Sequence, residues 1–153
     1  MKPLNGIKVI DLTHMLAGPY AGMVIADLGA EVVKVEPLSP GEMTRGLLQK
    51  DPNYSFKNFG AYFITLNRNK KSVSLDLKSD EGLSIFYDLV KTTDVVLNNF
   101  SAGVVKKLKI DFDSLKKVNP RIITCSITGF GETGPHSSRP AYDQIVQAYS
   151  GGM

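Results

Sequence analysis

The chain has 153 residues, of which 42% are hydrophobic and 22% charged, a composition typical of a soluble globular domain rather than a disordered segment. No apolar stretch reaches the roughly 20 residues of a membrane-spanning helix. The net charge of +3, without zinc-finger spacing or an aromatic-basic motif, argues against nucleic acid as a partner. The single cysteine, Cys125, rules out an intrachain disulfide, and the absence of a presequence pattern favours a cytoplasmic protein.

The first third of the chain has the pattern of a strand, a helix and a second strand. Residues 7–12 form an apolar run that predicts a buried strand, and residues 31–36 predict another. Between them we expect a helix that Pro19 opens and Gly29 closes. Proline suits the first helical position because its missing N–H has no intrahelical partner there, and glycine accepts the left-handed conformation past a helix end. Together these segments predict a βαβ unit.

Loops and short pieces are expected from residue 38 to 69, because Pro40, Gly41, Pro52, Asn53 and Gly60 interrupt the pattern. Regular structure resumes with a predicted strand over 73–77 and a helix that Ser79 caps. A strand over 95–97, a short helix over 104–108, a helix capped by Asp113 and a strand over 122–126 follow, and Cys125 is expected to be buried in this last strand. Alternating strands and helices predict an α/β fold with a parallel sheet.

The turn after the first strand does not have the pattern of a nicotinamide site. Such a turn shows G-x-G-x-x-G, whereas residues 16–22 contain only part of it and Pro19 removes an N–H that could donate to a phosphate. His14 and His136 lack partners for a metal site. Two groups of basic residues, at 68–78 and 106–117, could meet an anion or could simply be solvated.

Several sequence blocks, in order, carry a resemblance to a known family. They are PLNGIKVIDLT (3–13), AGP (17–19), DLGAEVVKVE (27–36), NRNKKS (67–72), NNF (98–100) and CSITGFGETGP (125–135). On these blocks the chain resembles the family III CoA-transferases of the CaiB/BaiF type. This family includes formyl-CoA, carnitine and glutarate CoA-transferases, and it shares its fold with α-methylacyl-CoA racemase.

The resemblance implies a Rossmann-like, open and mostly parallel sheet flanked by helices, with residues 1–153 forming the N-terminal portion of the family's large domain. It implies coenzyme A or an acyl-CoA as a substrate, a small carboxylic acid as the other, no prosthetic group and no metal. An interlocked homodimer is implied for a complete family member. The residues that would contact coenzyme A are His14, Leu16, Ala17, Arg45, Leu75, Asp76, Lys78, Asn99, Phe100, Ser101 and Lys107.

Within this site, Leu75–Lys78 and Asn99–Ser101 would contact the nucleotide, and Lys107 and Arg45 are candidate phosphate partners. The alternative for Asp76 and Lys78 is an ordinary strand end with solvated charges. The first turn would face the thioester end of the cofactor. Formyl-CoA transferase has a glutamine where this chain has Leu16, which argues against specificity for formate or oxalate.

Tyr142 and Asp143 would line the acyl pocket, although a capping aspartate and a tyrosine before a helix near Gln144 are an equal alternative. The racemase branch has a histidine where this chain has Tyr142, and a tyrosine with a reference pKa near 10 is a poor base for its proton transfer. A CoA-transferase is therefore preferred to a racemase. A non-catalytic CoA-binding or interaction fragment is a further alternative.

The family's mechanism implies an aspartate that attacks the acyl-CoA thioester. By the family's pattern this aspartate would lie beyond Met153, so no catalytic residue is assigned within the chain and the chain alone is expected to be inactive. The aspartates that are present have other expected roles, with Asp11 ending a strand, Asp27 on a helix and Asp94, Asp111 and Asp113 at turns or caps.

Overall fold

A five-stranded parallel sheet forms the centre of the computed structural model, which describes all residues 1–153. Its strands are β1 (Lys8–Asp11), β2 (Glu31–Glu36), β5 (Lys70–Ser74), β6 (Val95–Asn98) and β7 (Ile123–Ser126), in the order β5-β2-β1-β6-β7. Every neighbouring pair in this sheet is parallel. The chain extends the sheet from β1 to one side and then to the other, which is the Rossmann-like order. The predicted α/β fold is confirmed.

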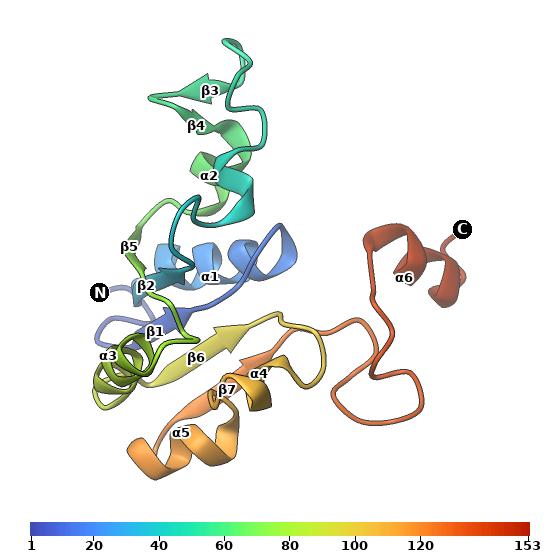
Figure 1. Cartoon of the computed structure of the whole chain (residues 1–153). Coiled ribbons are helices and arrows are strands. Elements are labelled where there is room, and N and C mark those ends of the chain that lie inside the picture. The colour runs from blue at the N-terminus through green and yellow to red at the C-terminus, as the bar shows by residue number, and fades with distance from the viewer.

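Helices cover both faces of this sheet (Figure 1). Helix α1 (Ala17–Asp27) covers one face, while α3 (Asp80–Val90) and α5 (Phe112–Val118) cover the other, and the short α4 (Val104–Lys107) follows β6. Side chains alternate along β1 because successive residues of a strand point to opposite faces. Val9 accordingly packs with Ala26 of α1, whereas Ile10 and Leu12 belong to the cluster on the α3 side.

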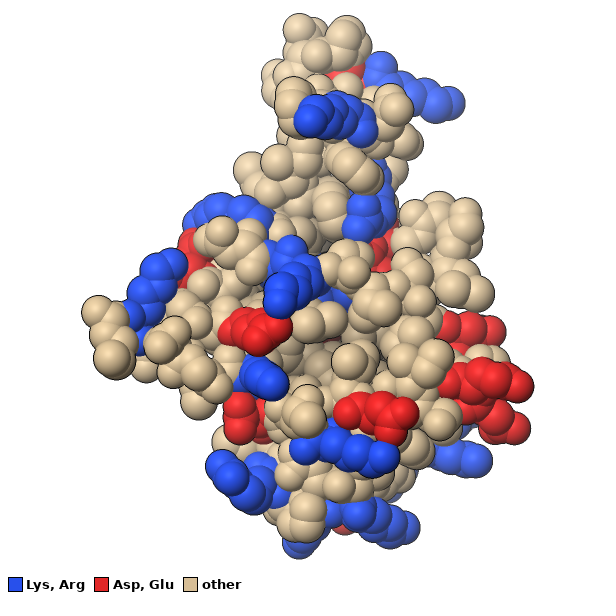
Figure 2. Space-filling model, turned by 90° about the vertical axis from the view of Figure 1, so that its left-hand side faces the viewer, with Lys and Arg blue, Asp and Glu red and all other residues tan.

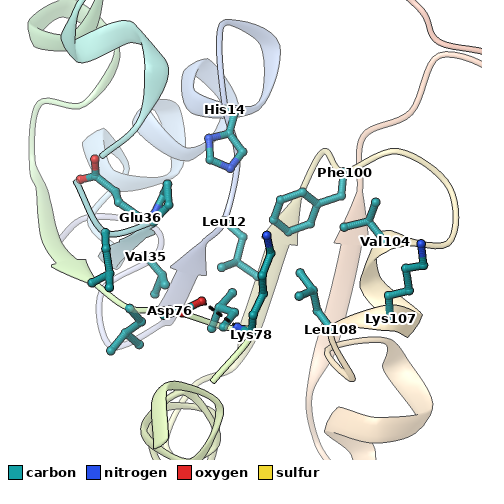
Figure 3. Close-up of a pocket in the computed structure, with 14 residues that line it drawn as sticks. Leu12, His14, Val35, Glu36, Asp76, Lys78, Phe100, Val104, Lys107 and Leu108 are labelled. Carbon is teal, nitrogen blue, oxygen red and sulfur yellow. Dashed lines mark hydrogen bonds between the residues drawn. The ribbon is translucent and has the colours of Figure 1, made fainter. Parts of the chain in front are cut away.

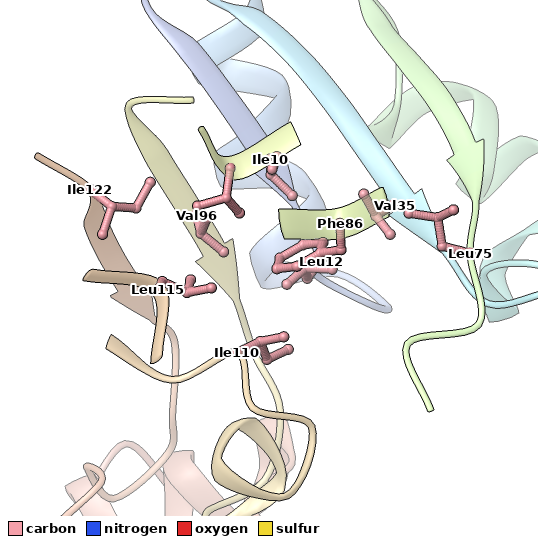
Figure 4. Packing of buried hydrophobic residues seen from close by; sticks show 10 residues of the cluster. Ile10, Leu12, Val35, Leu75, Phe86, Val96, Ile110, Leu115 and Ile122 are labelled. Carbon is pink, nitrogen blue, oxygen red and sulfur yellow. The ribbon is translucent and has the colours of Figure 1, made fainter. Parts of the chain in front are cut away.

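The main hydrophobic core lies between the sheet and helices α3 and α5 (Figure 4). Phe86 and Val90 of α3 and Leu115 of α5 are fully buried there against Ile10 and Val96 of the strands. Burying one such side chain contributes about 1.5–3 kcal/mol. Helix α3 therefore buries one apolar face, and Ser79 caps it as predicted, by accepting a hydrogen bond from the Gly82 N–H.

Between β2 and β5 the chain leaves the sheet and forms a protrusion (Figure 1). This 38–66 segment contains η1 (Met43–Arg45), the antiparallel pair β3 (Ser55–Phe56) and β4 (Phe59–Gly60), and α2 (Ala61–Leu66). The prediction of loops and short pieces is confirmed. After β7 the chain again leaves the sheet and ends with α6 (Asp143–Ser150), which stands apart from it.

Two element boundaries differ from the sequence prediction by more than one residue. Helix α1 begins two residues before Pro19, which is tolerated because the N–H groups of a helix's first turn need no intrahelical partner. Strand β5 covers Lys70–Ser74 rather than 73–77, because its pairing with β2 begins at Lys70 opposite Val32. Residues 75–77 consequently lie past the strand, at the carboxyl edge of the sheet.

Two residue assignments also differ. Asp111, not Asp113, caps α5, since its carboxylate accepts from the N–H and hydroxyl of Ser114. Cys125 lies in β7 as predicted but is exposed, so the prediction of its burial is wrong. The reason is that β7 is an edge strand, and Ile123, two residues before Cys125 on the same face, is also 60% exposed.

Candidate functional site

A cavity of about 780 Å³ opens at the carboxyl edge of the sheet. Segments that follow β1, β2, β5 and β6 converge on it, and α4 forms one wall (Figure 3). Strands β2 and β5 lie on one side of β1, and β6 and β7 lie on the other, so the strand order reverses between β1 and β6. Ligands of open α/β sheets bind in the crevice outside such a switch point. The size falls within the 300–1,000 Å³ of small-molecule sites. The cavity is lined by Leu12, His14, Val35, Glu36, Pro37, Leu38, Leu75, Asp76, Leu77, Lys78, Phe100, Val104, Lys107 and Leu108.

The cavity combines an apolar interior with two lysines at its edge. Leu12 and Leu75 are buried beneath it, while Lys78 and Lys107 are exposed and come from opposite sides. Neither lysine forms an ion pair within the chain. The Asp76 carboxylate accepts a hydrogen bond from the Lys78 N–H at 3.0 Å, which closes the turn after β5. Such a site offers apolar surface together with free cations, the requirements of an anionic ligand with an organic body.

The backbone of His14, which lines the cavity, is held by the side chain of Asn99. Its N–H donates to Asn99 Oδ1 and its carbonyl accepts from Asn99 Nδ2, both at 2.8 Å. The imidazole lies 5.7 Å from the Phe100 ring, between centroids. Burial, with the Lys34 charge nearby, lowers the pKa of His14 from its usual value near 6.5. The ring is therefore mostly neutral at pH 7 and can donate one hydrogen bond and accept another.

Behind the cavity, on the α1 face of the sheet, buried charges form two close ion pairs. Lys70 Nζ lies 2.7 Å from Asp11 Oδ2, and both side chains are 1% exposed or less. Glu36 binds Arg45 through two hydrogen bonds of 2.6 and 2.7 Å and also accepts from Ser72 Oγ. Burial alone would raise the pKa of the Glu36 carboxyl, but these bonds and the Glu42 N–H outweigh it and lower that pKa to about 2.

Residues 4–153 match the sequence description of CoA-transferase family III. The chain belongs to this family.

Named relatives agree with this assignment. A succinate–glutarate CoA-transferase of Agrobacterium fabrum is 45% identical over 99% of this chain, and a formyl-CoA:oxalate CoA-transferase of Streptomyces coelicolor is 42% identical over 99%. The crystal structure of a CaiB/BaiF family protein from Brucella suis superposes with a TM-score of 0.90 at 42% identity over 98% of this chain. The match covers 38%, 36% and 39% of these three proteins, so the chain spans well under half of their length.

Six of the residues predicted from the family III resemblance line the cavity: His14, Leu75, Asp76, Lys78, Phe100 and Lys107. Asn99 lies behind the wall, where it holds the His14 backbone. Leu16 and Ala17 begin α1 beyond the His14 turn, and Ser101 is exposed after Phe100. These residues are near the cavity but do not line it, so their contacts with coenzyme A remain predictions.

Three predicted residues lie elsewhere. The Arg45 guanidinium is taken up by Glu36 and stacks over the Phe63 ring at 3.9 Å, away from the cavity lining. Tyr142 is 70% exposed, and Asp143 begins α6 with its carboxylate accepting from Gln147 Nε2. The structure does not bring this Tyr-Asp pair to the cavity.

Sequence reasoning missed the apolar wall that residues 35–38 contribute. Val35, Pro37 and Leu38 line the cavity because β2 ends beside β1 at the carboxyl edge. Because neighbouring parallel strands end at the same edge of a sheet, the predicted end of this strand could have indicated the wall from the sequence. Glu36 is also among the lining residues, but its carboxylate points away from the cavity toward the 38–66 segment (Figure 3).

Other classes of site find no support in the geometry. No group of three or more His, Cys, Asp and Glu side chains is arranged to hold a metal ion. None of the helices is long and apolar enough to cross a lipid bilayer. Figure 2 shows Lys and Arg side chains interspersed with Asp and Glu over one face of the molecule, without a continuous basic surface on that face.

Proposed function

We propose that this chain forms the coenzyme A-binding part of an enzyme that moves CoA from an acyl-CoA to a small carboxylic acid. The observation that carries the proposal is the cavity at the switch point of a family III fold, which gathers His14, Leu75, Asp76, Lys78, Phe100 and Lys107 from four separate segments. Relatives named for transfer between succinate and glutarate point to small dicarboxylic acids as the class of acceptor, whereas Leu16 argues against oxalate.

The chemistry of coenzyme A fits this cavity. Its phosphates need cations, which Lys78 and Lys107 supply without competing carboxylate partners. Its adenine and pantetheine need apolar surface, which Leu38, Phe100 and Leu108 supply at the cavity wall. We place the nucleotide near Lys78 and Lys107, and the thioester toward the His14 turn at the start of α1.

The proposed reaction is nucleophilic catalysis by a carboxylate. The carboxylate attacks the thioester carbonyl, the C–S bond breaks, and a mixed anhydride and CoA thiolate form. The thiolate then attacks the enzyme-side carbonyl of the anhydride, which gives an enzyme thioester and releases the donor acid. The acceptor acid takes CoA by the same steps in reverse.

The attacking carboxylate is not among residues 1–153 in this proposal. Asp11, Glu36 and Glu42 are each 1% exposed or less and are committed to cations or backbone N–H groups. Asp76 is bound to the turn after β5. We accordingly expect the chain alone to bind coenzyme A without transferring it. For the enzyme as a whole we propose a cytoplasmic location and a homodimer.

Calorimetric titration of the chain with CoA tests the binding step. Lys78→Ala and Lys107→Ala should each weaken CoA binding roughly tenfold, because each removes one charge-assisted contact to a phosphate. Lys106→Ala is the matched control, since Lys106 neighbours Lys107 in α4 but does not line the cavity. NAD should bind far more weakly than CoA. Equal losses from Lys106→Ala and Lys107→Ala, or no binding of CoA at all, would refute the proposal.

Chromatography of the chain mixed with an acyl-CoA and a dicarboxylic acid tests the second step. We expect no exchange of CoA between the acids, and no uptake of solvent deuterium at the acyl α-carbon as a racemase would cause. Turnover by the chain alone would show that one of its own carboxylates is the nucleophile.

A further inference from the structure

The turn that carries His14 to the cavity has an uncommon backbone conformation. Met15, a residue with a side chain, has φ +66°, in the left-handed region that favours glycine. Such a conformation persists where the surrounding structure holds it, at a cost of order 1–3 kcal/mol. The question is therefore which groups hold the turn from Thr13 to Met15.

Side chains from four different segments hold this turn. Asp11 accepts from the Thr13 N–H, and Asn99 binds both the N–H and the carbonyl of His14. Lys34 Nζ donates to the Thr13 carbonyl at 2.6 Å, and Glu42 Oε1 accepts from the Met15 N–H at 2.9 Å. Every backbone N–H in the turn, and the carbonyls of Thr13 and His14, thus have a side-chain partner.

The charged side chains that contact the two ends of the turn, Lys34 and Glu42, form no ion pair. Asp11 pairs with Lys70, and Glu36 pairs with Arg45, each within 4.0 Å. Lys34 and Glu42 are equally buried, both 1% exposed, yet neither has an oppositely charged side-chain atom within that distance. Burying a charge without a close partner is costly, so a compensating interaction is expected.

The turn supplies part of that compensation, and the Glu42 carboxylate also accepts from the N–H and the hydroxyl of Thr44. The cation of Lys34 meets the carbonyl oxygen at one end, and the anion of Glu42 meets the N–H at the other. Each charge therefore faces the end of a peptide dipole that has the opposite sign, and hydrogen bonds to charged groups are stronger than neutral ones. Glu42 lies at the start of η1, so this contact also ties the 38–66 segment to the cavity.

We propose that Lys34 and Glu42 act as a pair of positioning residues, which hold the Thr13–Met15 turn so that His14 faces the reactive end of the bound acyl-CoA. This inference rests on the proposed function for the identity of the ligand. Its structural part, that the two charges fix the turn, does not depend on any ligand.

The charges that act on His14 give the pair a distinctive signature. Lys34 lowers the pKa of His14, whereas Glu42, Asp11 and Glu36 raise it. Lys34→Met should therefore raise the pKa of His14, and Glu42→Gln should lower it further. A purely steric disturbance of the turn would not move this pKa in opposite directions in the two variants.

The chain offers a matched control in an exposed ion pair that shares strand β2 with Lys34. Lys71 and Glu31 form an exposed pair at 2.7 Å on β5 and β2, so Lys71→Met and Glu31→Gln repeat the substitutions away from the turn. Proton NMR gives the pKa of His14, hydrogen exchange gives the protection of the Met15 amide, and titration calorimetry gives the affinities for acetyl-CoA and for adenosine 3′,5′-bisphosphate, which lacks the thioester arm.

We expect Glu42→Gln to speed exchange of the Met15 amide roughly tenfold or more, because the amide loses a hydrogen bond to a charged group. Lys34→Met and Glu42→Gln should weaken acetyl-CoA binding roughly tenfold and leave the bisphosphate affinity unchanged. The effects of the two substitutions should not add in the double variant, since both act on one turn.

The outcomes separate this inference from the proposed function. If the unaltered chain binds no acetyl-CoA, the proposed function fails. The exchange rate of the Met15 amide and the pKa of His14 then still test whether Lys34 and Glu42 fix the turn. If the chain binds acetyl-CoA and the Lys34 and Glu42 variants behave like the Lys71 and Glu31 controls in every readout, the positioning role is wrong. A Glu42→Gln chain that does not fold leaves Lys34→Met, which replaces the cation by an apolar side chain of similar length, to decide the matter.

Discussion

The Glu36–Arg45 pair should contribute measurably to stability, and Arg45→Met is the substitution that tests it. Methionine keeps an apolar stem beside Phe59 and Phe63 but removes both hydrogen bonds to Glu36. Lowering the pKa of Glu36 from 4.5 to about 2 corresponds to about 3 kcal/mol at 1.36 kcal/mol per pKa unit. Arg45 shares this effect with Ser72 and the Glu42 N–H, so we expect a loss of about 2 kcal/mol at pH 7.

The sign of the pH dependence follows from the depressed pKa. A carboxyl group whose folded pKa lies below its unfolded value stabilises the fold above the unfolded pKa, and this stability is lost as the pH falls through the folded pKa. The unaltered chain should therefore lose the contribution of Glu36 between about pH 4.5 and pH 2, and Arg45→Met should show much less of this loss.

Urea unfolding at pH 7 and at intervals down to pH 2 measures both effects. Arg68→Met is the matched control, because Arg68 pairs with Asp27 on the surface with side chains 53% and 33% exposed. Exposed pairs contribute less than about 1 kcal/mol. If Arg45→Met and Arg68→Met cost the same free energy of unfolding at pH 7, or if Arg45→Met keeps the full pH dependence, the buried pair does not have the assigned strength.

Two further tests concern the cap of α5 and the turn after β5. Asp111→Ala should lower the free energy of unfolding by about 1 kcal/mol because it removes the α5 cap, whereas Asp113→Ala should have a much smaller effect; thermal unfolding of both decides which aspartate is the cap. Gly82→Ala would place a Cβ 2.1 Å from the Asp76 carbonyl oxygen, so it should shift the turn after β5 and weaken CoA binding, and unchanged calorimetric affinity would contradict this.

Local signals predicted most elements of the fold, because each depends on a few neighbouring residues. The capping of α3 by Ser79 and the end of α1 at Gly29, which has φ +106°, need only the preferences of those residue types. The limits of β5 could not be predicted in the same way. Its first residues, Lys70 and Lys71, are charged, and only their pairing with β2 makes them part of the strand. Partner strands set the extent of a strand, and a single sequence does not show them.

Site residues that directly follow a strand could be predicted from the sequence. Contacts between charged residues that are far apart in the sequence could not. Phe100 and Lys78 could be placed at the carboxyl edge once the strands were counted. The partnership of Arg45 with Glu36 depends on how the 38–66 segment returns to β2, which no periodicity indicates. Lys34 and Glu36 alternate with valines in β2, so their common face was visible in the sequence, but their buried partners were not.

The difference between Arg45 and the two cavity lysines separates structural cations from candidate ligand contacts. The Arg45 guanidinium already binds a fully buried carboxylate, and a phosphate could recruit it only by leaving the Glu36 anion without its cation, with only Ser72 and the Glu42 N–H as partners. Lys78 and Lys107 have no carboxylate partner to give up and are exposed, so a phosphate gains their charge at the cost of side-chain entropy and partial desolvation, without breaking an ion pair. For a phosphate-bearing ligand in this fold, the free lysines at the rim of the cavity are therefore the favoured contacts.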